Sequence, residues 1–168
     1  TKIEGIALGN PPANEELARL RVPTPRDDYA ATVRAIAEVV HDLERRAGSH
    51  EPATVGVGIP GTIVRATGLV KNANSTWLIG KPLKQDLERA IGREVRVAND
   101  ANCFALSEAT DGAAAGAEVV FGVILGTGVG GGIVVRGRRV EGANAIAGEC
   151  GHNPLPLPHA EDLPLRPC

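Results

Sequence analysis

The sequence predicts an α/β fold, with a mixed or parallel sheet covered by helices on both sides. Short apolar runs of strand type alternate along the chain with longer segments of helical periodicity. The run at 118–125 is apolar on both faces, as strands inside a sheet are. Polar clusters follow the ends of several such runs, which is where open α/β folds bind their ligands.

The N-terminal part of the chain contains two expected strands and one expected helix. The strands cover 3–8 and 17–22, and prolines end the second of them. Residues 28–46 carry apolar side chains at helical spacing, and Gly48 follows as a stop signal.

The remaining elements follow the same criteria. They are a buried strand at 54–59, a hairpin at 62–64 and 68–70, a helix at 83–91, a strand at 95–98, an Ala-rich helix at 101–115, the strand at 118–125, and a strand, tight turn and strand over 133–140. We expect the small residues at 112–117 to join two lobes, and the Pro-rich stretch 154–167 to be an exposed loop.

Composition excludes some classes of function. The formal net charge is −2 without a concentrated Lys/Arg stripe, which argues against nucleic acid as a partner. No apolar run approaches the roughly 20 residues of a membrane helix, and no signal peptide is evident, so we expect a cytoplasmic protein that does not contact membranes. Because the chain starts at Thr1, lacks methionine and stops at Cys168 after a Pro-rich stretch, we also expect a fragment of a longer protein.

The glycine loop from Gly126 to Gly132 is a candidate phosphate-binding site. It fits the pattern G-x-G-x-x-G, but a strand follows it rather than the helix that dinucleotide binding needs, and the Gly-Lys-Ser/Thr ending of a P-loop is absent. Backbone N–H groups in a glycine-rich turn and the Thr127 hydroxyl could still bind nucleotide phosphates. The alternative is a flexible hairpin loop without a ligand.

Asp100 follows an expected strand and directly precedes an expected helix, with Asn99 and Asn102 beside it. It could act as a helix N-cap. It could also take the proton of a sugar hydroxyl as that oxygen attacks phosphorus, while Asn99 orients a neighbouring hydroxyl. Glu149 and His152 form a second polar cluster that could face the same cleft.

His152 has three possible roles: a sugar contact, a ligand of structural zinc together with Cys168, or a donor to a backbone carbonyl in a turn. His159 is a further possible zinc ligand. Cys103 is interpreted as a packing residue, and three cysteines make a disulfide framework improbable.

Several motifs in the same order resemble the ROK family of repressors and sugar kinases, and within it the bacterial fructokinases, also called manno(fructo)kinases. The motifs are Gly58-Ile59-Pro60-Gly61, the segment 72–78, Asn99-Asp100-Ala101-Asn102, Gly126-Thr127-Gly128 and the segment 148–156. The resemblance runs along essentially the whole chain.

The resemblance implies an actin-like ATPase (ribonuclease H-like) fold of two lobes with sugar and ATP between them. Residues 1–115 would form the N-terminal lobe without its first strand, and 116–168 the start of the ATP-binding lobe, truncated at a zinc-motif cysteine. It implies that Asp100 is the catalytic base. It further implies sugar contacts by Gly61, Asn99, Glu149 and His152, and ATP phosphate contacts by Thr1, Lys2, Gly126, Thr127 and Gly128.

Metals and missing segments follow from the same resemblance. Zinc would be held by His152 and Cys168 with cysteines absent here, and magnesium would accompany ATP. An aspartate expected before Thr1 and the adenosine-binding remainder are also absent. We therefore expect this chain alone to be inactive and to bind zinc poorly.

For the intact protein we expect transfer of the ATP γ-phosphoryl group to the 6-hydroxyl of a hexose, with D-fructose preferred, by a possible homodimer. Two alternatives remain open: a kinase for glucose, mannose or an N-acetylated amino sugar, and a sugar-sensing ROK repressor.

Overall fold

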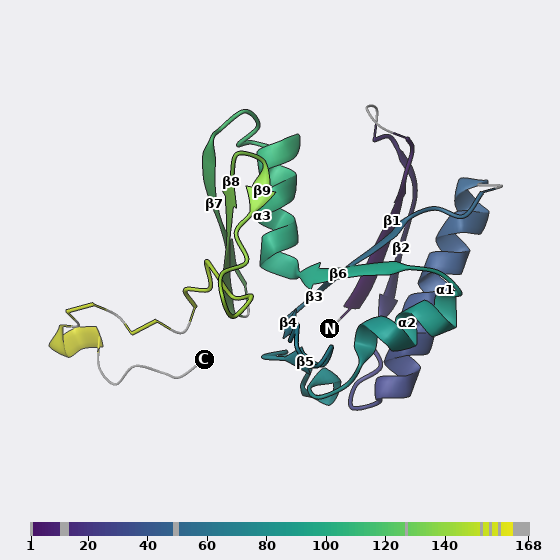
Figure 1. Ribbon diagram of the computed structural model, residues 1–168, viewed down its shortest axis with the longest axis horizontal. Coiled ribbons are helices and arrows are strands. Elements are labelled where there is room, and N and C mark those ends of the chain that lie inside the picture. Colours follow the sequence, from purple (N-terminus) through teal and green to yellow (C-terminus); the bar gives the residue numbers. More distant parts are fainter. Residues whose placement is uncertain are drawn as a thin grey trace. The chain divides into compact units, whose positions relative to one another are not determined.

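The computed structural model describes residues 2–10, 14–48, 51–126, 128–151, 153–154, 156–157 and 159–162. Contacts divide the chain into two compact units, Thr1–Ala98 and Asn99–Cys168, and the elements of both are labelled in Figure 1. None of the helices in the described ranges is both long and apolar enough to span a membrane.

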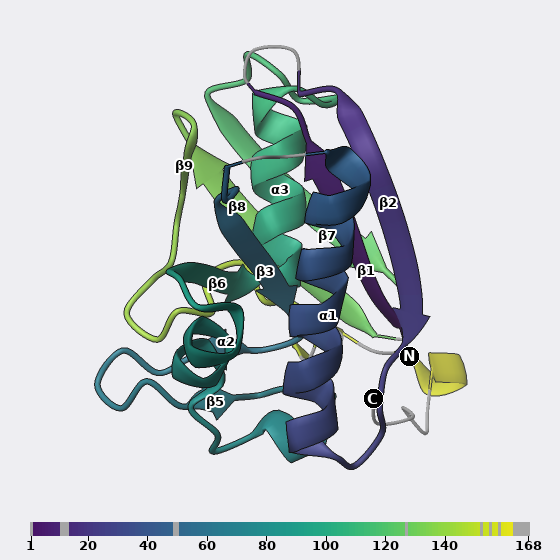
Figure 2. The same cartoon turned by 90° about the vertical axis from the view of Figure 1, so that its right-hand side faces the viewer.

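The first unit begins with an antiparallel strand pair covered by a long helix. β1 (Lys2–Leu8) pairs with β2 (Glu16–Pro23), with Gly5 opposite Leu20. α1 (Tyr29–Ala47) lies along this pair (Figure 2). The Asp28 carboxylate caps α1 by accepting from the N–H of Ala31, and Gly48 ends the helix in the left-handed conformation, so both predicted ends of this helix are confirmed within a residue.

The rest of the first unit surrounds a second, separate strand pair. β3 (Val55–Ile59) lies beside β6 (Val95–Asn99), although α2 (Leu83–Ile91) separates them in sequence. β4 (Thr62–Ile63) and β5 (Val70–Lys71) form the predicted hairpin, and η1 (Thr76–Leu78) is a 3₁₀ turn. The main core lies here, and its buried members are Val33, Ala37, Ile59, Val70, Ala73, Leu78, Leu83, Leu87, Ile91 and Val95.

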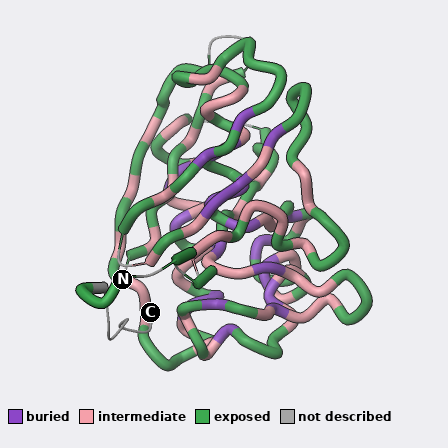
Figure 3. Tube along the Cα trace, turned by 90° about the vertical axis from the view of Figure 1, so that its left-hand side faces the viewer, coloured by how far each residue is buried: buried purple, intermediate pink, exposed green. Residues whose placement is uncertain are grey.

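The second unit is a β-hairpin with one helix packed on it. β7 (Val119–Leu125) pairs antiparallel with β8 (Val129–Val135), and β9 (Arg138–Arg139) extends the sheet. α3 (Asp100–Thr110) packs on β7 and β8 around a small core of Ala105, Val120 and Val134. Buried residues alternate with less buried ones along β7, whereas β8 buries the adjacent residues Gly131 and Gly132. Figure 3 shows the burial along the chain.

The structure differs from the sequence-based expectations in three places. The strands form four small sheets, and the register is antiparallel in the pairs β1–β2, β4–β5, β7–β8 and β8–β9. α3 ends at Thr110 rather than 115, because Glu108 turns back to accept from the N–H of Ala113 at 2.8 Å. The units meet between Ala98 and Asn99 rather than after 115, because α3 packs on the hairpin that follows it.

The Pro-rich stretch 154–167 is exposed at the described residues, as expected. It contains one 3₁₀ turn, η2 (Ala160–Asp162).

Candidate active site

The start of α3 presents a carboxylate to solvent. Asn99 is the N-cap of the helix: its Oδ1 accepts from the N–H of Asn102 at 3.0 Å, and the residue is 9% exposed. Asp100 is exposed, and its Oδ1 accepts from the adjacent N–H of Ala101 at 2.8 Å. The capping role considered for Asp100 therefore belongs to Asn99, so helix capping does not account for an aspartate at position 100.

The glycine-rich segment joins two strands, as the sequence predicts, but the second strand begins earlier than expected: β8 starts at Val129 rather than Ile133, so Gly130–Gly132 belong to the strand. In the turn, the N–H of Gly126 donates to the carbonyl of Gly128 at 2.9 Å. In β8, a Cβ placed on Gly132 would lie 2.7 Å from the carbonyl oxygen of Ala101, and one on Gly130 would lie 3.3 Å from the Ala101 Cβ. The first turn of α3, which carries Asp100, thus rests on the backbone of β8.

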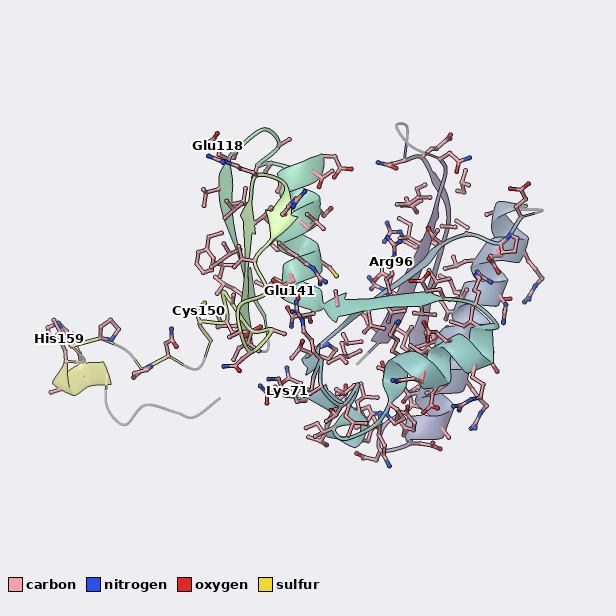
Figure 4. The ribbon with its side chains drawn as sticks, in the orientation of Figure 1. Lys71, Arg96, Glu118, Glu141, Cys150 and His159 are labelled. Atoms are coloured by element: carbon pink, nitrogen blue, oxygen red, sulfur yellow. The ribbon has the colours of Figure 1, made fainter. Side chains whose placement is uncertain are left out.

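The segment around Glu149 approaches the same strand from its other face. A Cβ on Gly131 would clash with the carbonyl oxygen of Gly148, and one on Gly151 would clash with the carbonyl oxygen of Val129. Figure 4 shows Cys150 near the turn of the hairpin, at the opposite end from Glu118. Glu149 itself is exposed, and its N–H donates to the carbonyl of Ile146 at 3.2 Å.

Three sequence motifs therefore converge on β8. Because successive residues of a strand point to opposite faces, Gly130 and Gly132 face α3, whereas Gly131 faces the Gly148–Gly151 segment. The segments that carry the exposed residues Asp100 and Glu149 thus contact one strand from its two opposite faces. Exposed carboxylates near a backbone turn can accept a proton or hydrogen-bond a polyol.

The other predicted site residues lie elsewhere or outside the described ranges. Gly61 belongs to the first unit, at a φ of 120°, where a Cβ would meet the carbonyl oxygen of Lys71 at 2.6 Å. Lys2 is an exposed residue at the start of β1. Four predicted site residues are outside the described ranges: Thr1, Thr127, His152 and Cys168.

The structure supplies no geometry for the expected zinc site. Within the described ranges, no three His, Cys, Asp or Glu side chains are grouped so that they could hold a metal ion. The residues expected to bind zinc, His152 and Cys168, fall outside those ranges.

Two residues of α3 were not anticipated correctly. Cys103, interpreted as a packing residue, is exposed because α3 buries Ala101 and Ala105 against the hairpin. Partial desolvation nevertheless raises the pKa of the Cys103 thiol, so the thiol form predominates at neutral pH. Asn102 is buried, and its Oδ1 has no hydrogen-bond donor among the described residues. Nothing in the sequence distinguishes this asparagine from the capping Asn99.

Comparison with known proteins identifies the family of the chain. The chain matches the ROK family over residues 1–165. It is 48% identical to the N-acetyl-D-glucosamine kinase of Vibrio cholerae serotype O1, over 100% of this chain and 56% of that protein. It is 45% identical to the N-acetyl-D-glucosamine kinase of Escherichia coli O6:H1, over 97% of this chain and 55% of that protein. The chain thus spans little more than half the length of these relatives.

Solved structures give the same result. The match to a ROK hexokinase from Thermus thermophilus covers 92% of this chain and 54% of the hexokinase chain, with a TM-score of 0.74 and 33% identity. The match to a ROK glucokinase from Streptomyces griseus, in complex with glucose and AMPPNP, covers 90% of this chain and 47% of the glucokinase chain, with a TM-score of 0.76 and 30% identity. The predicted closeness to fructokinases is not shown by these relatives, whereas the actin-like α/β fold is confirmed. The chain belongs to the ROK family.

Proposed function

We propose that the protein containing this chain transfers the γ-phosphoryl group of ATP to the 6-hydroxyl of N-acetyl-D-glucosamine. The observation that carries the proposal is the 48% identity to a kinase of that name along the whole chain, together with the exposed Asp100 at the start of α3. The sequence alone favoured D-fructose, and the relatives favour instead the N-acetylated amino sugar that it held as an alternative.

Asp100 is the proposed catalytic base. Its carboxylate is exposed and is not the cap of α3, and it would accept the proton of the sugar hydroxyl as that oxygen attacks the γ-phosphorus. Base catalysis of this kind contributes about 10²- to 10⁴-fold in rate. The developing charge on the phosphoryl oxygens would be balanced by magnesium bound with ATP and by backbone N–H groups.

The residues that contact the sugar and the phosphates are proposals as well. Gly61, Asn99, Glu149 and His152 would bind the sugar. Thr1, Lys2, Gly126, Thr127 and Gly128 would contact the phosphates. Since the N–H of Gly126 donates within the turn, Thr127 and Gly128 are the stronger candidates there.

A substrate panel tests the sugar. With the full-length protein, ADP release would be measured on N-acetyl-D-glucosamine, N-acetylmannosamine, glucose, mannose and fructose. We expect the highest kcat/KM on N-acetyl-D-glucosamine. A sugar that lacks one apolar contact made by this substrate in the pocket should have a kcat/KM about 10- to 200-fold lower. A preference for fructose would contradict the substrate assignment, and sugar binding without turnover would indicate a sensor instead of a kinase.

The variant Asp100→Asn tests the base. We expect kcat to fall by about 10²- to 10⁴-fold while the KM for the sugar changes little. Asp111→Asn is the matched control, because Asp111 is an exposed aspartate at the other end of the same helix. Near-normal kcat for Asp100→Asn would refute the base assignment.

A further inference from the structure

Residues 71–80 form a loop whose two ends are joined beside β5. The N–H of Gly80 donates to the carbonyl of Val70 at 2.9 Å, and the N–H of Val70 donates to the carbonyl of Lys81 at 3.1 Å. Near the start of the loop, Ala73 is 5% exposed and belongs to the main core of the first unit. The ends of the loop and its first turn are therefore fixed by backbone pairing and burial.

Gly61, one of the proposed sugar contacts, rests directly on the start of this loop. It has a φ of 120°. A Cβ on it would lie 2.6 Å from the carbonyl oxygen of Lys71 and 3.0 Å from both N and Cα of Ala73. Because the two backbones touch with no side chain between them, a displacement of the loop at Lys71 and Ala73 displaces Gly61 as well.

Trp77 ties the same loop to the beginning of α1. Its indole Nε1–H donates to Oγ1 of Thr32 at 3.0 Å. Thr32 is 3% exposed, and its hydroxyl donates in turn to the carbonyl of Asp28 at 2.8 Å, with the carbonyl of Pro25 at 3.1 Å as a second acceptor. A hydroxyl that both accepts and donates in this way is oriented from both sides.

The hydrogen bond gives the loop an orientation that apolar packing alone does not supply. The indole ring of Trp77 also packs against the main core, but apolar contacts are non-directional. The 3₁₀ turn η1 has short-range backbone bonds, from the N–H of Leu78 to Ser75 and from that of Ile79 to Thr76, each 3.0 Å long. These bonds hold the turn together without fixing its direction relative to α1.

We propose that Trp77 and Thr32 are positioning residues for the sugar: their hydrogen bond orients the loop 71–80 and, through it, the backbone of Gly61. The inference rests on the proposed sugar contact of Gly61. Thr32 is buried and acts through the loop. The effect belongs to sugar binding and not to phosphoryl transfer, because the proposed base, Asp100, lies in the second unit.

Steady-state kinetics of the full-length protein test the proposal. Trp77→Phe keeps an aromatic ring and removes the N–H, whereas Thr32→Val keeps the shape of the side chain and removes the hydroxyl. We expect each change to raise the KM for the sugar about three- to tenfold, while kcat and the KM for ATP change less than about twofold. The double variant should have the sugar KM of either single variant, because both changes remove the same bond.

Two matched variants separate positioning from a general loss of stability. Thr32→Ser retains the hydroxyl, so its sugar KM should stay within about twofold of the wild-type value. Tyr29→Phe removes a different side-chain hydrogen bond of the same unit, from Tyr29 to Asp86, and should leave the sugar KM unchanged. If Trp77→Phe fails to fold, the comparison of Thr32→Val with Thr32→Ser decides the matter.

The kinetics would use whichever sugar of the panel the wild-type protein phosphorylates best. If no sugar is turned over, the dissociation constant of the sugar measured by calorimetry replaces KM, so an error in the proposed substrate or activity leaves this test intact. The proposal is overturned if Trp77→Phe and Thr32→Val bind the sugar as the wild type does. It is also overturned if kcat falls as strongly as kcat/KM, or if Tyr29→Phe raises the sugar KM equally.

Discussion

Replacing Gly132 by alanine should weaken the packing of α3 on β8. The new methyl group would lie 2.7 Å from the carbonyl oxygen of Ala101 and 3.0 Å from both Asn102 Cα and Ala105 Cβ, whereas carbon contacts are ordinarily about 3.5–4.0 Å. All three neighbours belong to one helix, so α3 must move as a body by roughly 0.5–1 Å. Overpacking costs about 1–3 kcal/mol, and alanine recovers about 0.4–1 kcal/mol by restricting the unfolded chain. The net loss should be about 1–2 kcal/mol.

Gly130→Ala is the matched control, because it adds the same methyl group two residues earlier on the same face of the strand. Its Cβ would meet only the Ala101 Cβ, at 3.3 Å, so the free energy of unfolding should change by less than about 0.5 kcal/mol. Urea unfolding followed by circular dichroism measures both variants. Because Asp100 lies on the displaced turn, Gly132→Ala should also lower the kcat of the proposed kinase activity, measured with the full-length protein. Equal urea midpoints for the two variants would refute the packing argument.

Three further predictions concern the first unit. Tyr29→Phe removes the hydroxyl that donates to Asp86 and holds the pKa of that carboxyl below its usual value. Because the pKa of Asp86 is lower in the folded protein than in the unfolded one, this interaction stabilises the protein above the unfolded pKa, and the stabilisation is lost as the pH falls. The variant should therefore lower the free energy of unfolding by about 1 kcal/mol at pH 7 and by much less below about pH 4. Urea unfolding at each pH measures this difference. Arg93→Met removes the ion pair with Glu44 at a site where both side chains are 22% exposed, although Glu44 still accepts from the N–H of Ala53. Thermal unfolding should show a loss of about 1–3 kcal/mol. Gly61→Ala should cost about 2–4 kcal/mol in urea unfolding, because it combines a positive φ with a 2.6 Å approach to a carbonyl oxygen; an unchanged midpoint would show that the turn can relax.

The sequence predicts a helix or strand well where the residues that determine its position lie within the element itself. α1 was expected over 28–46 and is found at Tyr29–Ala47, because its apolar spacing, its Asp28 cap and its Gly48 stop all lie within the segment itself. The pairing of β3 with β6 could not be read in the same way, since it joins strands separated by α2. The end of α3 was also missed, because it depends on one glutamate side chain turning back onto the chain.

In the candidate site too, features with a local cause were predicted and features that depend on distant residues were not. The sequence identifies Asn99 and Asp100 as a polar pair at a helix start, but which of them caps the helix depends on backbone torsions that only coordinates provide. The burial of Asn102 depends on the approach of β8, which is distant in sequence. The identity of the sugar depends on pocket contacts worth only about 1–3 kcal/mol, which short motifs do not encode.

The glycine loop illustrates how one pattern can serve two purposes. Packing accounts for two of its consecutive strand glycines: Gly132 admits the first turn of α3, and Gly131 admits the backbone of Gly148 from the other face. Phosphate binding is therefore not needed to explain Gly131 and Gly132, and it rests on the turn at 126–128. It follows that a substitution in the turn should raise the KM for ATP without loss of stability, whereas one at Gly132 should reduce stability first.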